Sequence, residues 1–316
     1  MDLLIQKIIT TITYYDVLDY PMTSFEIWKY LIACSVERGA CNKEEKKCSL
    51  LDIINALESE KVKKHVEQYQ GYYFLKGRRE LVGQRIEKNK IAQEKFKKVS
   101  KVVGILRFIP FVRMVAVTGT LAMKNTDRSS DLDLLVVLKS GHIFTGRTLV
   151  TGMVHLLGVR RYEKKISNRV CLNFFLTDQS LDVDIKDLFS SSEYYFIWPL
   201  FGRETFRKFQ NANEWIGEFR ENFFLEEAAN LKMIDDHLLI RAVREVGEFV
   251  LSSRLIEDRL KKWQIERIKK DPRTHLGGSM VMADDNALIF LPEPQGPGVY
   301  GRFKERLEKL AIADLK

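Results

Sequence analysis

The amino-acid sequence predicts an α+β protein built around a central mixed sheet. Two short apolar runs, Met114 to Thr118 and Leu134 to Leu138, lie in the middle of the 316-residue chain and are typical of buried strands. Segments with the 3.6-residue periodicity of amphipathic helices lie on both sides of them. The chain is long enough for two or three domains, and its hydrophobic content of 45% is ordinary for a globular protein.

The composition favours an anionic partner. The formal net charge is +8 and the pI is near 9.1, which suits nucleic acid or a nucleoside triphosphate, although many basic proteins bind neither. No run approaches the ~20 apolar residues of a membrane span, and the N-terminal stretch lacks the features of a signal peptide. We therefore expect a cytoplasmic protein with no membrane partner, and the sequence leaves the oligomeric state open.

The four cysteines do not form a metal-binding motif. Cys34, Cys41 and Cys48 are spaced seven residues apart, Cys171 stands alone, and no CxxC pair is present. A metal site in the first three is a minor alternative. Reduced thiols in a cytosolic protein are the preferred interpretation.

The first 75 residues predict three helices and two short strands. Pro21 ends the first helix, Thr23 or Ser24 can cap the second, and Ser49 can cap the third. Gln70-Gly71 is typical of a turn between strands. In order, we expect helices over residues 1–20, Phe25–Ala33 and Leu50–Glu58, with a polar loop over 35–48, and then strands over Val62–Glu67 and Tyr72–Leu75.

Three helices followed by a hairpin resemble the winged helix-turn-helix domains of prokaryotic regulators, and we place this domain at residues 1–78. The resemblance implies that Leu50–Glu58 is a recognition helix and 62–75 the wing, with duplex binding in the major groove. That helix contains acidic residues and no Lys or Arg. Since acidic residues facing phosphates lower affinity, we favour a structural or protein-contact role.

A basic connecting segment follows, which we place at residues 79–110. Residues 76–100 hold nine Lys and Arg against three Glu and predict a long helix from Leu81. A second helix is expected from Val102 to Phe108, ended by Pro110. The segment is interpreted as a solvated connecting helix, with a rail for nucleic-acid phosphates as the alternative.

The segment between the two central strands has the features of a ligand site. Gly119-Thr120 breaks the first strand, as glycine does where the backbone must turn tightly or approach a ligand. Asp131 and Asp133 open the second strand. Residues two apart on a strand point to the same face, so the two carboxylates are expected side by side. Their repulsion raises the pKa of one of the two carboxyl groups unless a cation lies between them. Mg²⁺ is the usual cation at such a site.

These residues resemble the signature of the DNA polymerase beta-like nucleotidyltransferase superfamily. The shared pattern is an apolar strand, Gly119-Thr120, a gap of ten residues and Asp131-Leu132-Asp133-Leu134. Thr120 stands where Ser is commoner and keeps the hydroxyl. The resemblance implies a nucleotidyltransferase-like core over residues 111–200. It also implies Mg²⁺ or Mn²⁺ held by Asp131 and Asp133, and transfer of a nucleoside monophosphate from an NTP such as ATP to a hydroxyl acceptor.

The same resemblance suggests nucleotide-binding residues around the turn. Gly119 and Thr120 would seat the β- and γ-phosphates, because glycine allows N–H donors to approach an anion closely. Lys124 and Arg128 are candidates for phosphate contacts, with solvated loop charges as the equal alternative. The remaining candidates, Ser129 and Ser130, would orient Asp131 or a sugar hydroxyl.

The third catalytic position is the main departure from the superfamily. The resemblance implies a third carboxylate on a later strand, here Val170–Thr177, but the polar mid-strand residue is Asn173. An amide can bind a metal or a hydroxyl but cannot act as a general base. Asp182 and Asp184, on an expected strand Leu181–Ile185, are the alternatives. A catalytically impaired nucleotide-sensing or nucleic-acid-binding regulatory protein is therefore the second functional hypothesis.

The rest of the chain is predicted to be mainly helical, with residues 201–316 forming a C-terminal helical region that carries a short β-hairpin. Residues 187–224 are rich in aromatic residues, which we interpret as core rather than as a base-stacking platform. Residues 160–169 are interpreted as a solvated connection. The expected elements are helices over Ile143–Leu157, Glu193–Ile197, 225–268 and Tyr300–Leu310, and a hairpin of Met280–Ala283 with Ala287–Leu291.

Overall fold

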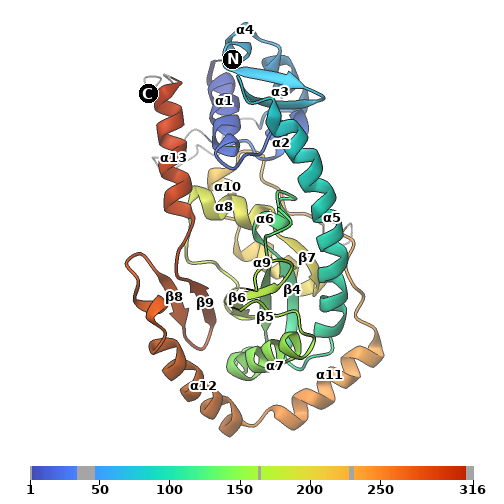
Figure 1. Ribbon diagram of the computed structural model, residues 1–316. Helices are drawn as coiled ribbons and strands as arrows, with labels where there is room; N and C mark the ends of the chain where they lie inside the picture. Colours follow the sequence, from blue (N-terminus) through green and yellow to red (C-terminus); the bar gives the residue numbers. More distant parts are fainter. Residues whose placement is uncertain (1, 34–46, 163–164, 228–230, 311–316) are drawn as a thin grey trace.

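The computed structural model describes residues 2–33, 47–162, 165–227 and 231–310. It is an α+β structure with a small three-stranded sheet near the N-terminus and a mixed six-stranded sheet in the middle (Figure 1). The predicted α+β class is confirmed. Within these ranges, no helix combines the length and apolar character needed to cross a membrane. Cys34, Cys41 and most of the expected polar loop over 35–48 lie outside the described residues.

The described part of the N-terminal unit contains four helices and a sheet of order β1-β3-β2. Capping boxes at Thr23 and Ser49 begin the second and third helices. The β2–β3 turn, Gln70-Gly71, has positive φ at both residues, which is typical of a tight hairpin. The elements are α1 (Asp2–Asp16), β1 (Met22–Thr23), α2 (Ser24–Lys29), α3 (Leu50–Leu57), α4 (Glu60–Lys63), β2 (Val66–Tyr69) and β3 (Tyr72–Leu75).

Three predicted boundaries in this unit are wrong. The first helix was expected over residues 1–20 but ends at Asp16. The expected strand Val62–Glu67 begins only at Val66, because Ser59 caps the short helix α4. The second helix was expected to reach Ala33 but ends at Lys29. Its last residues instead pair with a distant segment, since the Ala33 N–H donates to the Phe219 carbonyl at 3.0 Å. A long-range contact therefore overrides the local helical pattern.

Helix α5 (Glu80–Leu106) runs without interruption from the N-terminal unit to the sheet (Figure 1). The two helices expected here are one, because no residue before Pro110 stops the helix and Gly104 is accommodated inside it. Two of its cations, Arg85 and Lys95, are buried, so the expected fully solvated face of this helix is wrong at those positions.

The central sheet has the strand order β7-β4-β5-β6-β9-β8. The β5–β6 pair is parallel and the other pairs are antiparallel, and β5 is buried along most of its length. The expected C-terminal hairpin is confirmed and joins this sheet through β9. The strands are β4 (Val112–Val117), β5 (Leu132–Leu138), β6 (Val170–Thr177), β7 (Trp198–Phe201), β8 (Met280–Ala283) and β9 (Ala287–Leu291).

The strand expected over Leu181–Ile185 does not form. The edge of β6 that it would need is occupied by β9, which pairs with Phe174, Phe175 and Leu176. The segment therefore has no strand to pair with and remains irregular. Asp182 and Asp184 are consequently exposed rather than aligned on the sheet.

The remaining helices pack around the central sheet. Tyr194, Phe201, Phe206 and Phe209 are buried, so the aromatic segment forms core as predicted. The last helix begins four residues earlier than expected, because Pro297 is tolerated in a first helical turn. These helices are α6 (Gly119–Ala122), α7 (Ile143–Leu156), α8 (Leu188–Tyr195), α9 (Arg203–Ala212), α10 (Ile216–Phe219), α11 (Leu238–Leu251), α12 (Arg254–Lys269) and α13 (Gly296–Lys309), with a 3₁₀ turn at Pro272–His275.

Arg220 joins the N-terminal unit to the core. Its side chain is fully buried, and its guanidinium donates to the Tyr30 carbonyl at 3.0 Å and to Ser191 Oγ at 3.2 Å. It also lies over the Tyr14 ring at 5.4 Å. A buried cation is tolerated only where its donors are satisfied, so this contact fixes how α8 meets the first two helices.

We predict that Arg220→Met lowers the free energy of unfolding by about 3 kcal/mol, because buried acceptors lose charged donors. Urea unfolding at neutral pH measures the change. Arg207→Met on the exposed face of α9 is the matched control and should cost less than about 0.5 kcal/mol. Equal losses in the two variants would show that the Arg220 contacts contribute nothing specific.

Candidate functional site

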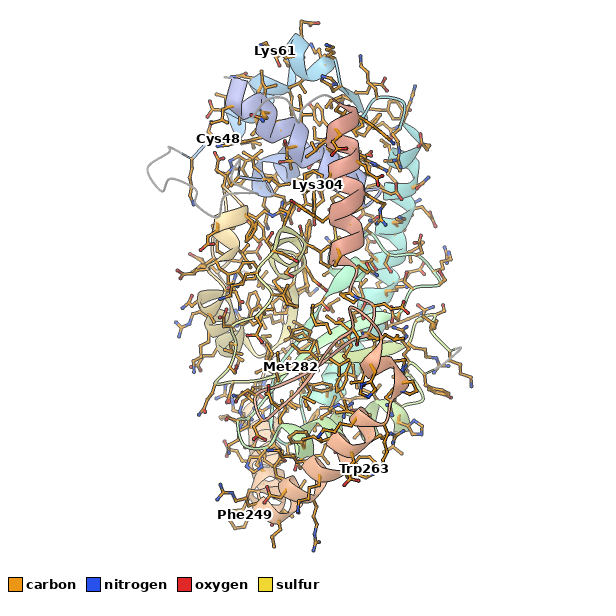
Figure 2. The ribbon with its side chains drawn as sticks, turned by 90° about the vertical axis from the view of Figure 1, so that its left-hand side faces the viewer. Cys48, Lys61, Phe249, Trp263, Met282 and Lys304 are labelled. Carbon is orange, nitrogen blue, oxygen red and sulfur yellow. The ribbon has the colours of Figure 1, made fainter. Side chains whose placement is uncertain are left out.

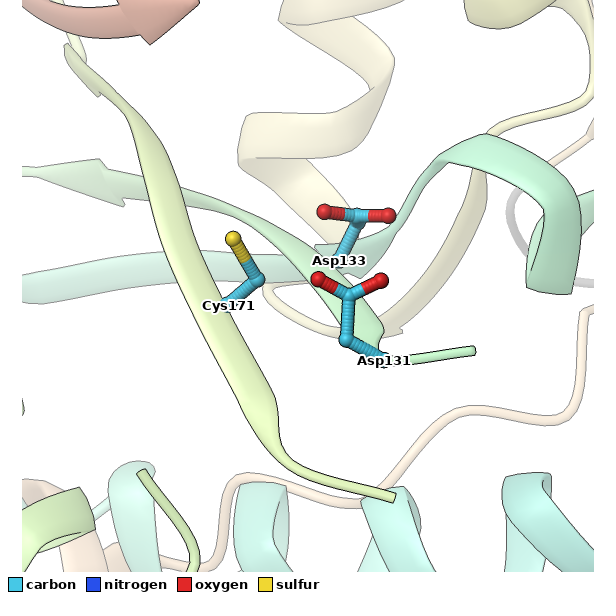
Figure 3. A group of neighbouring side chains, drawn as sticks. All are labelled: Asp131, Asp133 and Cys171. Atoms are coloured by element: carbon cyan, nitrogen blue, oxygen red, sulfur yellow. The ribbon is translucent and has the colours of Figure 1, made fainter. Parts of the chain in front are cut away.

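The candidate site lies at the start of β5 and β6. Asp131 and Asp133 open β5, and Cys171 is opposite Asp133 on the parallel neighbour β6. The three side chains project to the same side, with the carboxylates adjacent and the thiol facing them (Figure 3). One ligand atom from each residue lies within 4.8 Å of the others. The sheet therefore brings two carboxylates and a thiol into one small space.

A β-bulge in β6 shapes this space. Cys171 is opposite Asp133, whereas Phe174 is opposite Leu135, so β6 has one extra residue between the paired positions. The simple alternation expected along Val170–Thr177 is therefore wrong. Asn173 remains beside the site, and its Nδ2 donates to Asp133 Oδ1 at 3.4 Å.

The electrostatics of the group centre on Asp133. Burial and the neighbouring Asp131 charge raise the pKa of Asp133 to about 7, against the opposing effects of Cys171, Arg161 and Asn173. Burial and the two carboxylates raise the pKa of the Cys171 thiol to about 12. At neutral pH Cys171 is therefore a protonated hydrogen-bond donor and not a thiolate.

Gly119 brings the backbone against Asp133. Its φ is +64°, and a Cβ at this position would lie 3.0 Å from Asp133 Oδ2. The neighbouring Thr118 N–H donates to the Asp133 carbonyl at 3.1 Å. Both the backbone conformation and the close approach therefore require glycine. Thr120 follows and is exposed.

Lys95 of α5 holds the loop that leads to Asp131. Its ammonium donates to the carbonyls of Asp127 at 2.5 Å and Ser130 at 2.7 Å, and to Thr126 Oγ1 at 3.2 Å. Burial lowers the pKa of Lys95, and the charges of Asp131 and Asp127 oppose that effect. Three oxygen acceptors around one buried cation make this a rigid support for the carboxylate pair.

Arg161 contacts one of the two carboxylates, that of Asp131. Its Nη1 lies 2.5 Å from Asp131 Oδ2 and 3.5 Å from Cys171 Sγ. The main chain is fixed by the Arg161 N–H donating to the Val170 carbonyl at 2.9 Å, while 41% of the side chain is exposed. Arg161 was not predicted as a site residue, because residues 160–169 were expected to be a solvated connection.

Glu193 of α8 is a further acidic group whose charge reaches the site. Burial, the Asp133 charge and the Asp187 charge together raise the pKa of Glu193 to about 7. Glu193 was expected at the start of a helix, and its place in the sequence predicts no functional role for it. In the folded structure, the packing of α8 brings the Glu193 carboxylate near enough to Asp133 for the two charges to repel each other.

The other predicted residues lie in the loop before Asp131, and their side-chain contacts are with groups other than the two carboxylates. Lys124 Nζ lies over the Trp198 ring at 5.2 Å, and Arg128 pairs with Glu87 at 3.3 Å. Ser130 Oγ accepts from the Asp127 N–H at 3.2 Å. Ser129 is exposed.

The alternative third acids belong elsewhere. Asp182 and Asp184 line a separate cavity of about 240 Å³ formed with the β8–β9 hairpin. Asp182 also pairs with Lys186 at 2.8 Å. Of the two options left open by the sequence, only Asn173 therefore contacts Asp133.

Comparison of the chain with protein-family models, with curated proteins and with solved structures found no match.

We predict that Asp133→Asn stabilises the protein at pH 8 in the absence of divalent cations. The folded-state pKa of about 7 exceeds the ordinary value of 3.8, so ionisation costs stability as the pH rises from about 4 through 7. Removing the charge should raise the free energy of unfolding by about 2 kcal/mol at pH 8 and by little at pH 4.

Urea unfolding in EDTA at both pH values measures this difference. Asp184→Asn, at an exposed carboxylate, is the control and should show no such dependence. An Asp133→Asn variant that is less stable than the wild type at pH 8 would contradict the prediction.

Proposed function

We propose that this chain is a Mg²⁺-dependent nucleotidyltransferase that transfers a nucleoside monophosphate from an NTP to a hydroxyl acceptor. The observation that carries the proposal is the approach of the Gly119 backbone to a like-charged carboxylate pair, Asp131 and Asp133. This arrangement costs stability without a bound cation. Such strain is typical of functional sites rather than structural ones.

The donor set fits a hard divalent cation. Mg²⁺ prefers carboxylate oxygens and usually takes its other ligands from water and phosphate. Asp131 and Asp133 supply two carboxylates, and the protonated Cys171 thiol acts as a hydrogen-bond donor beside them. When bound, the ion neutralises phosphate charge and lowers the pKa of the acceptor hydroxyl. Mn²⁺ has the same ligand preference.

The chain's own residues have distinct roles in this proposal. The backbone at Gly119 and Thr120 donates N–H groups to the phosphates. Arg161 exchanges its contact with Asp131 for a phosphate oxygen, since its side chain is partly exposed. Asn173 orients Asp133 through its amide and takes no proton.

A nucleotide-sensing module is the second candidate. It is favoured by Asn173, which cannot act as a base, and by the connection between the N-terminal unit and the loop. The Asn125 amide donates to the Leu18 carbonyl at 2.7 Å, and Arg85 donates to the Met123 carbonyl at 3.1 Å. A change in the loop on nucleotide binding would therefore reach the N-terminal unit directly.

The N-terminal unit itself supports a protein-contact role more than DNA binding. The winged-helix proposal made from the sequence is supported by the β2–β3 hairpin that follows the helices, although the unit has a fourth helix and a strand β1 that were not predicted. The exposed residues of α3 include Leu51, Ile54 and Asn55, and the helix has no Lys or Arg. Nucleic acid thus remains the weaker partner proposal. An affinity for duplex DNA that falls steeply as the salt concentration rises would favour a nucleic-acid partner.

Pyrophosphate release tests the transferase proposal directly. Purified protein is incubated with each NTP and Mg²⁺ or Mn²⁺, and Asp131→Asn with Asp133→Asn is run beside Asp184→Asn as control. We expect release that the double variant loses and the control keeps. Mg²⁺-NTP binding without release, with several hydroxyl acceptors supplied, would favour the sensing module.

A further inference from the structure

Helix α11 presents an apolar face to solvent at the end of the molecule opposite the N-terminal unit (Figure 1). Phe249 projects from this end in Figure 2. The exposed apolar residues have exposed fractions between 55% and 85% and are Leu238, Leu239, Val243, Val246, Phe249 and Val250. A contiguous patch of this kind on one helix marks an interaction surface.

Polar contacts fix α11 with this face outward. Glu248 accepts from the Phe111 N–H at 3.0 Å and pairs with Arg113 at 2.7 Å. Burial alone would raise the pKa of Glu248, but these hydrogen bonds lower it to about 2. Arg244 donates to the Arg107 carbonyl at 2.9 Å. Turning the apolar face inward would break these charged contacts.

Close packing adds to this constraint on the helix. A Cβ at Gly247 would lie 2.5 Å from Pro110 Cγ, so the inner face of α11 has no room for a larger side chain. Ile240 is buried on the same face. The outward direction of the apolar residues is therefore set by several contacts along the helix.

The spacing on the outer face is that of a helix–helix seam. Leu239, Val243, Val246 and Val250 are separated by four, three and four residues, which is the a/d pattern of a two-stranded coiled coil. Ala242 and Phe249 flank the seam. With no charge at these flanking positions, two copies of the same face meet without like-charge repulsion.

The size of the face suits a dimer. Six such side chains offer roughly 60–120 Å² of apolar surface each, or on the order of 500 Å² in total. Two copies would bury roughly 1,000 Å², which reaches the lower limit of specific interfaces. Symmetric homodimers are also the commonest oligomers.

We propose that α11 packs antiparallel against α11 of a second copy of this chain. The seam is symmetric about its midpoint, so Leu239 meets Val250 of the second copy and Val243 meets Val246 of the second copy. Antiparallel packing also opposes the helix dipoles favourably.

In this dimer, the Asp131–Asp133 site of each of the two copies is left uncovered. Glu248 contacts Lys139, at 3.3 Å, just after β5 ends, whereas Asp131 and Asp133 lie where β5 begins. The interface and the candidate site are therefore at opposite ends of one strand. The dimer does not depend on the proposed transferase activity.

Sedimentation equilibrium of the full chain, from roughly 1 to 100 µM, tests the proposal. We expect a dimer that Leu239→Asp or Val246→Asp weakens by more than about tenfold, because each places a charge in the seam. Leu156→Asp on α7 is the matched control, since Leu156 and Leu239 are both 81% exposed. Circular dichroism confirms that each variant is folded.

A paired substitution distinguishes the helix orientation. In the antiparallel dimer, Leu239→Asp with Val250→Lys sets opposite charges against each other at both ends and should recover part of the lost affinity. Absence of recovery would overturn the antiparallel arrangement. A wild type that is monomeric at all concentrations, or equal loss in Leu156→Asp, would overturn the dimer. Seam-dependent binding of a monomer to phosphatidylcholine–phosphatidylserine vesicles would assign the face to lipid instead.

Discussion

The site depends on two buried cations of helix α5. Arg85 bonds to Tyr20 and Glu26 of the N-terminal unit and also to the carbonyl of Met123. Ten residues further along the same helix, Lys95 donates hydrogen bonds to three oxygen atoms of the loop before Asp131. A buried cation that loses its partners is costly, so the helix, the N-terminal unit and the loop hold one another in place. The loop that separates Gly119 from the carboxylates is therefore supported at both ends.

On this support the protein keeps an unfavourable charge arrangement. The backbone of β5 fixes Asp131 and Asp133 beside each other, and the backbone at Gly119 approaches Asp133 so closely that a side chain there would crowd its carboxylate. Arg161 relieves only part of the repulsion, from a side chain that is partly exposed. The surrounding core includes the fully buried Val136 and Phe175. Its packing offsets the loss of stability that the repulsion between the two carboxylates causes.

Local sequence patterns predicted the parts of the structure that depend on local physics. Strand alternation placed Asp131 and Asp133 together, and the glycine at 119 marked a close approach. Contacts between distant segments could not be predicted in this way. Cys171 pairs with Asp133 next to a bulge in β6, the packing of α8 brings the Glu193 charge near Asp133, and Arg161 follows Arg160, which forms an isolated bridge with Val170. The strand expected over 181–185 failed because a hairpin a hundred residues later takes its place.

That late hairpin has a consequence for synthesis. Strand β6, which carries Cys171 and Asn173, pairs with β9, and β9 is completed only at Leu291. A nascent chain emerging at about 5–20 residues per second exposes the hydrogen-bonding edge of β6 for several seconds before its partner leaves the ribosome. Helix α13 then returns to α1, where Arg306 pairs with the buried Asp16. The β8–β9 hairpin thus protects an edge that is open to aggregation until it pairs, and α13 contacts α1 only after the hairpin has been made.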